Sequence, residues 1–248
     1  MRSRSRVRRW LAGIVLFLAA GLAFMAAGLV ASAWLGPAQK PQAFPPTSYP
    51  VPPWDATPSP VPRPAGQTAL ASPVRVVPGT RQADGVWLGY PHTPTGAVSA
   101  AAAFTPAVLG TLDAGRAAQV MRLIADPSFP QGPAQAAQGV TGIRRTLGLA
   151  ASGPVPQGYA WAVTPVECQV RDVSTDRVTV LLLVDLTSTV PGAGTITRAS
   201  VFPVAVHWAA GDWKVLPTPA TSYAKLTAVP GSKRATSLGW LQISGGQS

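Results

Sequence analysis

The feature that most constrains this chain is an uncharged apolar run over residues 11–35, LAGIVLFLAAGLAFMAAGLVASAWL. As an α-helix, these 25 residues would reach about 37 Å, enough to cross a hydrocarbon core of roughly 30 Å with some tilt. An isolated segment in lipid must satisfy its own backbone groups, and only a helix does so. The run therefore predicts a single transmembrane helix over residues 11–35.

The residues that flank this run predict its orientation. Residues 1–10 form a basic tail that contains Arg2, Arg4, Arg6, Arg8 and Arg9, whereas only Lys40 follows the run closely. Two tryptophans, Trp10 and Trp34, stand where indole rings favour the membrane interfaces. Because positive residues stay on the cytoplasmic side, we expect a single-pass protein of the cell membrane with a cytoplasmic N-terminus and an extracytoplasmic C-terminal domain.

A cleaved signal peptide is the alternative interpretation, because Ala31-Ser32-Ala33 has a small-x-small pattern. The apolar run before it is longer than the roughly 7–15 residues of a typical signal-peptide core, so we favour an uncleaved anchor. The arginine tail then accounts for part of the net charge of +11. We therefore expect contact with the membrane and no direct nucleic-acid binding.

Small residues recur every four positions along the predicted span, at Ala19, Ala23, Ala27 and Ala31. Such a stripe lets two helices approach closely in a membrane. Alanine is frequent throughout the chain, so the stripe has a compositional explanation as well. If the protein forms a homo-oligomer in the membrane, this is the helix face that we expect to associate.

Residues 36–80 are expected to form a linker. They contain 13 prolines, including Pro45-Pro46 and Pro52-Pro53, and few charges. Proline has no amide donor, and the segment lacks the apolar periodicity of a packed core. A polyproline II chain of this length would reach roughly 140 Å, so we expect a semi-rigid spacer that holds the following domain away from the membrane.

Residues 81–220 show first a helical and then a two-residue apolar period, which predicts an extracytoplasmic α+β domain. Thr93 and Asp113 stand where helix N-caps are expected, and Pro106 leaves open whether the first helical segment is one helix or two. We expect helices over 95–110, 114–125 and 133–149, and strands over 159–171, 177–189, 196–209 and 212–217. The predicted fold class is α+β, with helices packed on a bent antiparallel sheet. Residues 221–248 are expected to form a C-terminal tail or a docking segment around Gly239-Trp240-Leu241.

Two stretches carry a resemblance to known families. The stretch Ala209-Ala-Gly-Asp-Trp-Lys-Val215 resembles the closing hairpin and last strand of the cone-shaped nuclear-transport-factor-two-like (cystatin-like) fold. The stretch Gly85-Val-Trp-Leu-Gly-Tyr-Pro-His-Thr-Pro-Thr-Gly-Ala-Val98, together with the arginine-rich start, the span and the linker, resembles membrane-anchored proteins of actinobacterial conjugative elements. Their layout is similar to that of TcpC-like assembly proteins of type IV secretion, which implies a scaffold role in DNA transfer.

Few residues suggest a chemical site. Asp185 lies among apolar neighbours in the second strand and His207 lies in the third, so the two are candidates for a pocket. General acid–base chemistry would need them within hydrogen-bond reach, which the sequence does not establish. We expect His92 to cap backbone groups, Arg144 and Arg145 to lie on a solvated helix face, and Cys168 to be a buried, inert thiol with the strand parity of Ala162.

The sequence lacks the spacing of a metal site, a phosphate loop or a serine elbow, so we expect no cofactor, no metal and no catalysis. The leading hypothesis is a membrane-anchored, non-enzymatic scaffold whose partners are the membrane and other protein components of a conjugation or secretion complex. One alternative is a tethered ligand-binding or enzymatic cone domain. Another is a wall-associated protein without a role in transfer.

Overall fold

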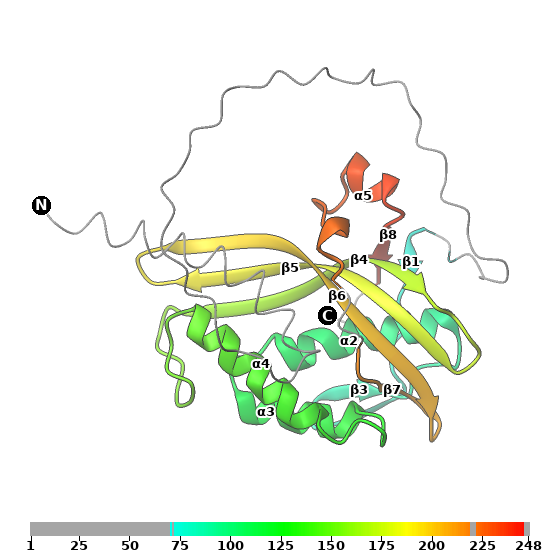
Figure 1. Cartoon of the computed structure of the whole chain (residues 1–248), viewed down its shortest axis with the longest axis horizontal. Coiled ribbons are helices and arrows are strands. Elements are labelled where there is room, and N and C mark those ends of the chain that lie inside the picture. Colours follow the sequence, from blue (N-terminus) through cyan, green and yellow to red (C-terminus); the bar gives the residue numbers. More distant parts are fainter. Residues whose placement is uncertain (1–69, 71, 219–221, 246–248) are drawn as a thin grey trace, which may run out of the picture.

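The computed structural model describes residues 70, 72–218 and 222–245, which form one α+β unit (Figure 1). The predicted tail, transmembrane helix and alanine stripe, and most of the predicted linker, lie outside these residues. Within the described ranges, no helix is both long and apolar enough to cross a membrane.

A six-stranded sheet with the order β1-β8-β4-β5-β6-β7 forms the framework. Neighbouring strands are antiparallel except β1 and β8, which are parallel. The strands are β1 (Val74–Arg75), β4 (Ala160–Arg171), β5 (Arg177–Val190), β6 (Gly194–Ala209), β7 (Asp212–Val215) and β8 (Leu241–Ser244). The long strands β4, β5 and β6 curl over the helices (Figure 1). A separate hairpin joins β2 (Arg81–Ala83) and β3 (Val86–Leu88).

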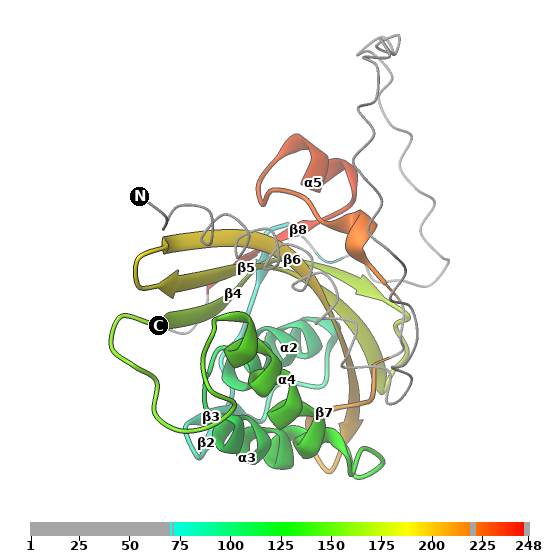
Figure 2. The ribbon, with the colours of Figure 1, turned by 60° about the vertical axis from the view of Figure 1, so that its left-hand side comes forward.

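The helices begin where the sequence predicted, and they cover one face of the sheet (Figure 2). They are α2 (Pro94–Leu109), α3 (Ala114–Ile124) and α4 (Gly132–Thr146). The side chains of Thr93 and Asp113 accept N-cap hydrogen bonds from Gly96 and Arg116, which confirms both predicted caps. Pro106 lies inside α2, so this segment is one helix. It continues past the lost hydrogen bond because buried side chains pack on both sides of the proline: Phe104, Val108 and Leu109.

The middle of the sheet is buried on both faces. Even-numbered residues of β5 such as Val180 and Leu182 pack with the helices, whereas Leu181 and Leu183 pack with the C-terminal segment. That segment consists of η2 (Ala224–Leu226), α5 (Lys233–Ser237) and β8. It lies on the opposite side of the sheet from α2, α3 and α4 (Figure 2). Trp240, only 4% exposed, packs with Leu181 and Leu183 and anchors this segment against the sheet.

A β-bulge in β4 changes which residues of that strand face the helices. The pairing of β4 with β5 shifts by one residue between Pro165 and Glu167. As a result Cys168 pairs with Leu182 on the helix side, and its predicted parity with Ala162 is wrong. Its predicted burial is confirmed, at 0% exposure. Burial, reinforced by the charge of Glu167, raises the pKa of the Cys168 thiol to about 12.

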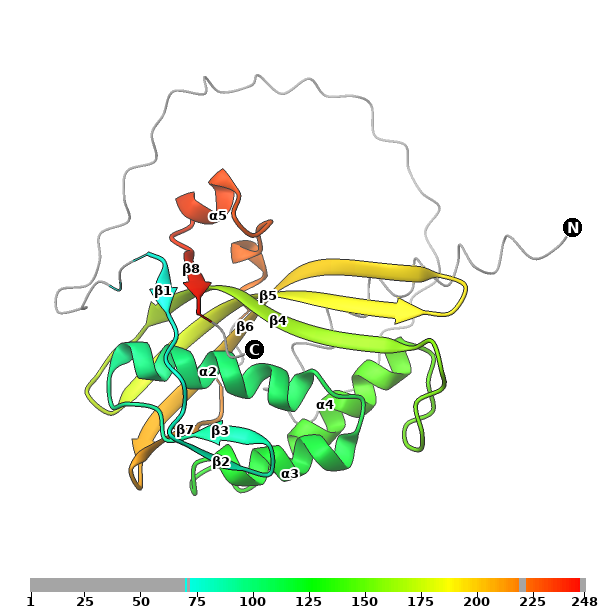
Figure 3. The same cartoon turned by 180° about the vertical axis from the view of Figure 1, so that it is seen from behind.

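The folded unit begins before residue 81, where the sequence pattern placed its start. β1 pairs with β8, and Val74 is 3% exposed in the main core. Figure 3 shows β1 beside β8 at one edge of the sheet. The pairing joins segments about 170 residues apart in the sequence, so the proline content of residues 36–80 did not reveal it.

Pro203 lies within β6, at a position where the sheet continues without a bulge. The register of β5 and β6 runs without interruption from Arg177–His207 to Val190–Gly194. β7 pairs only with Val206–Ala209, so no strand of the described residues pairs with Pro203 on the outer side of β6. Proline is tolerated there because its missing N–H is not needed for the sheet.

Candidate functional site

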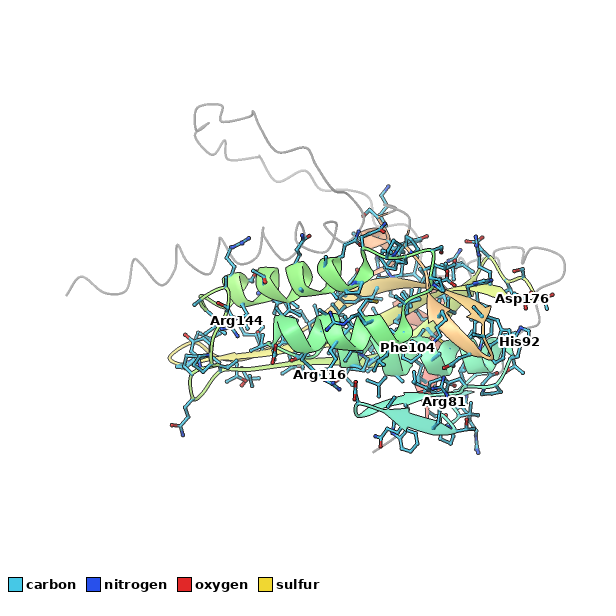
Figure 4. The ribbon with its side chains drawn as sticks, turned by 90° about the horizontal axis from the view of Figure 1, so that it is seen from below. Arg81, His92, Phe104, Arg116, Arg144 and Asp176 are labelled. Atoms are coloured by element: carbon cyan, nitrogen blue, oxygen red, sulfur yellow. The ribbon has the colours of Figure 1, made fainter. Side chains whose placement is uncertain are left out.

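Polar and aromatic side chains gather at the end of the sheet where the β4–β5 turn approaches the start of α2. His92 Nε2 lies 2.9 Å from the carbonyl oxygen of Thr175 and 2.9 Å from Asp176 Oδ1. Both partners are acceptors, so Nε2 carries a proton and donates. His92 therefore binds a backbone group as predicted, and it also forms an ion pair with Asp176 when protonated. Figure 4 shows His92 and Asp176 together at this end.

Three rings, His92, Trp208 and Trp213, form what we call the aromatic clasp. The imidazole of His92 stacks on Trp208 with ring centroids 4.3 Å apart and an angle of 5° between the planes. Trp213 meets His92 and Trp208 edge-on, at 5.6 Å and 5.4 Å. Trp213 is 1% exposed and donates from Nε1 to the carbonyl of Pro91. The clasp thus ties the turn before α2 to the β6–β7 hairpin.

Asp212 is the buried anchor of the same hairpin. Its carboxylate, 0% exposed, accepts hydrogen bonds from the backbone N–H groups of Gly89 and Trp213 and from the guanidinium of Arg81. These bonds hold the β2–β3 hairpin against β7. Burial, and then the negative charge of Asp212, raises the pKa of Tyr90 to about 12.

A second polar pair, Asp126 and His207, lies on the other face of the sheet. Asp126 follows α3, and its backbone N–H donates to Val215 at the outer edge of β7. Its Oδ2 lies 2.8 Å from His207 Nδ1, and its Oδ1 accepts bonds from the N–H and Oγ of Ser128. Burial alone would raise the pKa of Asp126, but the hydrogen bonds from His207 and Ser128 outweigh it and lower the pKa to about 2.

The chemistry open to this pair is general acid–base catalysis. An imidazole held through Nδ1 by a carboxylate has a fixed tautomer and an oriented Nε2, and His207 is about one-third exposed. Ser128 Oγ donates to Asp126 at 2.6 Å, so this hydroxyl is bonded to the carboxylate and not to the imidazole. The serine is therefore not arranged as an activated nucleophile.

His207 also belongs to a row of basic residues across three strands. The register places Arg177 of β5, His207 of β6 and Lys214 of β7 directly opposite one another, so all three share one face. Lys214 Nζ donates to the carbonyl of Leu123 near the C-terminal end of α3. The partial negative charge at that end of a helix favours a cation. The row gives this end of the sheet a basic surface.

The two residues predicted as a pocket, Asp185 and His207, are not brought together. Asp185 pairs with Ala199 and His207 pairs with Arg177, eight residues along the same strands. At roughly 3.3 Å per residue their separation is about 26 Å. They share a face of the sheet but lie too far apart along the strands to line one small pocket or to exchange a proton directly. His207 is instead paired with Asp126.

The prediction of a solvated helix face is wrong for Arg144, which is buried, whereas its neighbour Arg145 is exposed. The Arg144 guanidinium is buried, with the residue 3% exposed, and donates to the carbonyls of Leu112, Ala150 and Gly153. Figure 4 shows it at the opposite end of the domain from His92. Its role is to close the loop that follows α4 onto the end of α2.

Sequence reasoning missed the partners Asp126, Asp176 and Asp212. The signal available for Asp126 was its position before Pro127 and Ser128, a pattern typical of an Asx turn. Over the part of the chain that the structure describes, no three His, Cys, Asp or Glu side chains are grouped to hold a metal ion.

The comparisons with known proteins identify a family. A family model described as a domain of unknown function, DUF8175, matches residues 66–237. This range includes every element from β1 to α5 and leaves out β8. No curated protein and no solved structure matches the chain.

Proposed function

The chain belongs to the DUF8175 family, and we propose that it is a single-pass, membrane-anchored scaffold whose extracytoplasmic domain acts through protein contacts. The observation that carries the proposal is the order of segments: five arginines, an uncharged run over 11–35, and a proline-rich stretch that leads into β1. This order suits a domain that must be retained at the membrane and must reach outward from it.

The packing inside the curved sheet supports a scaffold over an enzyme with a cone-shaped pocket. In the cone-shaped fold that the sequence resembles, a ligand would lie between the helices and the concave face of the sheet. Here that space is occupied by fully buried side chains, among them Phe104, Val180, Leu182 and Val206. We therefore infer a cone-shaped architecture in which core side chains occupy the space that a ligand pocket would need.

Two buried charged groups, Asp212 and Arg144, also support a scaffold, because each is engaged by its own domain. Asp212 binds two backbone amides and Arg144 binds three carbonyls. Groups with such partners stabilise the fold and are not free to exchange protons with a substrate.

The proposed partners are protein components of a conjugative DNA-transfer apparatus of the type IV secretion kind. The resemblance of residues 85–98 and of the whole layout to membrane-anchored proteins of conjugative elements supports this choice. Crosslinking in producing cells, followed by purification of the tagged full chain, should recover channel or coupling components. Recovery of none of these components would overturn the assignment.

Fractionation tests the anchor itself. The full chain should remain in the membrane pellet after high-salt and alkaline washes, and protease added outside the cell should remove the C-terminal domain. A variant with the five arginines replaced by alanine should lose its uniform orientation, because the positive-inside signal is gone. A product in the culture medium trimmed after Ala33 would contradict the proposal.

The hydrogen bond between Asp126 and His207 favours a second candidate function, a tethered domain with general acid–base activity. The His207 side chain is about one-third exposed, so this candidate requires that a substrate reach it from solvent. This candidate predicts that a His207→Gln variant is inactive in a transfer assay although it folds and binds its partners. The scaffold function predicts normal transfer by the same variant.

A further inference from the structure

The outer edge of β6 is open over most of its length. β5 pairs with β6 from Val190–Gly194 to Arg177–His207, but β7 covers only Val206–Ala209. Between the hairpin turn and Ala205, the described residues on the outer side contribute two bonds: Leu216 N–H to Ala205 O, and Thr218 Oγ1 to Pro203 O. Among the described residues, Gly194–Val201 of β6 thus has no strand paired to its outer side.

The hydrogen-bond alternation identifies which residues face outward. In an antiparallel ladder, successive residues direct their N–H and C=O groups to opposite sides. Trp208 bonds inward to Asp176, and Ala205 bonds outward to Leu216. Even-numbered residues of β6 therefore bond to β5 and odd-numbered residues point outward. The outward set that lies before Pro203 is Thr195, Thr197, Ala199 and Val201.

The side chains beside this edge form a small, mostly uncharged face. Cross-strand hydroxyl pairs join Thr187 to Thr197 at 3.0 Å and Thr189 to Thr195 at 2.8 Å. Exposed edge strands usually carry charged residues that block pairing with another strand. From Gly194 to Val201 the charged residue is Arg198, which the register with Leu186 places on the helix side. The threonine face therefore does not repel another strand.

We propose that β6 pairs antiparallel with β6 of a second copy, so that the sheets of two domains join into one. The inference rests on the proposed membrane anchor, because tethering two copies in one membrane raises their effective concentration enough to favour a short strand pairing. The new element is the surface: the edge from Thr195 to Ala199, with Thr197 at the twofold axis.

The position of the rest of the chain favours a second copy as the occupant. The segment before the described domain enters at β1, and the sheet order places β1 at the edge opposite to β6 and β7. Residues 36–69, extended, would reach roughly 105 Å, so two anchored domains can turn their β6 edges toward each other. The same residues are rich in proline, which supplies no N–H donors and makes them a poor partner strand.

The sequence of β6 selects the register. A twofold axis at residue 198 would set the two Arg198 side chains directly opposite each other, and like charges in that position are destabilising. An axis at Ala199 would pair Thr195 with Pro203, which lacks the N–H that the ladder requires. An axis at Thr197 pairs Thr195 with Ala199 and avoids both problems.

Disulfide trapping tests the pairing in membranes that contain the full chain. The Cα atoms of two opposed Thr197 residues would lie about 5.5 Å apart, within the range of a disulfide. Thr197→Cys should give a covalent dimer on addition of an oxidant. Thr187→Cys is the matched control: it lies on the same face one strand inward, so two copies would be about 14 Å apart and should not crosslink. Cys168 is buried and does not compete.

Mixed copies test the register. Thr195→Cys and Ala199→Cys, on differently tagged chains in one membrane, should form a mixed dimer, whereas each variant alone should not crosslink. Three results would overturn the proposal. They are covalent dimers of Thr187→Cys, equal crosslinking in every combination of the cysteine variants, and a disulfide between Thr197→Cys and another protein. So would failure of Thr197→Cys to crosslink in chains that are found in the membrane fraction. Failure of the anchor would instead appear as chains absent from that fraction.

Discussion

The carboxylate of Asp126 and the imidazole of His207 are joined around the β7 edge of the sheet by a 2.8 Å hydrogen bond. The two residues are 81 positions apart in the sequence. The loop after α3 carries Asp126 past Val215 to the face of the sheet that His207 occupies. The contact therefore fastens the helical layer to the far edge of the sheet.

This contact predicts a loss of stability in acid. The pKa of Asp126 is about 2 in the folded chain and 3.8 when unperturbed. Because the folded chain binds this proton more weakly than the unfolded chain, the ionised carboxylate stabilises the folded state fully above about pH 4. This contribution is lost as the pH falls through 2. After allowance for solvent around the exposed imidazole, we expect a contribution of about 1 kcal/mol. Denaturant unfolding of the detergent-solubilised chain at pH 2–6 should show this loss, and Asp126→Asn should not.

Removal of the buried guanidinium of Arg144 should destabilise the domain strongly. Arg144→Met would leave the carbonyls of Leu112, Ala150 and Gly153 without their donor, at an expected cost of about 3 kcal/mol in unfolding free energy. Arg145→Met, at the exposed neighbouring position, is the control and should change stability by less than about 0.5 kcal/mol. Equal effects of the two substitutions would contradict the structural role of Arg144.

Asp212 should matter more to stability than its ion-pair partner. Asp212→Ala would leave the amides of Gly89 and Trp213 without an acceptor, and we expect a loss of about 2–3 kcal/mol. Arg81→Ala should lose less than about 1 kcal/mol, because the Arg81 side chain is 54% exposed. Chemical denaturation monitored by tryptophan fluorescence measures both variants, and a larger effect of Arg81→Ala would reverse the argument.

The thiol of Cys168 should be unreactive in the native chain. With a pKa of about 12 and no exposed surface, it offers almost no thiolate at pH 8. A thiol-specific reagent should label it only after denaturation, as mass spectrometry of the labelled chain would show. The exposed cysteine of Thr197→Cys is an internal control that should react in the native state. Rapid labelling of Cys168 would mean that the sheet opens locally.

Several features of the domain were predictable from local sequence. Thr93 and Asp113 cap helices because a short polar side chain before an apolar helical period satisfies the first free N–H groups. The turn at Ala210-Gly211 was recognisable too, and both residues have positive φ there. The two-residue apolar period of β5 and β6 correctly indicated strands.

Other features depended on contacts between distant segments. The bulge between Pro165 and Glu167 reassigns the face of Cys168. A proline within a strand period is a signal of a bulge, but Pro203 gives the same signal in a strand whose register is uninterrupted. Arg144 looks like any solvated arginine on a helix until the loop at Ala150 and Gly153 folds over it. For the candidate site, the sequence singled out His207 and Asp185 as candidates for one pocket, and the strand register places the two far apart.

The helix starts and the strand period follow from local sequence, because caps, turns and apolar spacing act within a few residues. The anchor and linker are predictions of the same local kind. Contacts between distant segments make Asp126 the partner of His207 and pair β1 with β8. Such contacts also leave most of the outer edge of β6 without a paired strand among the described residues. These outcomes depend on how strands register and how loops cross the sheet, which are set by the packing of the whole domain.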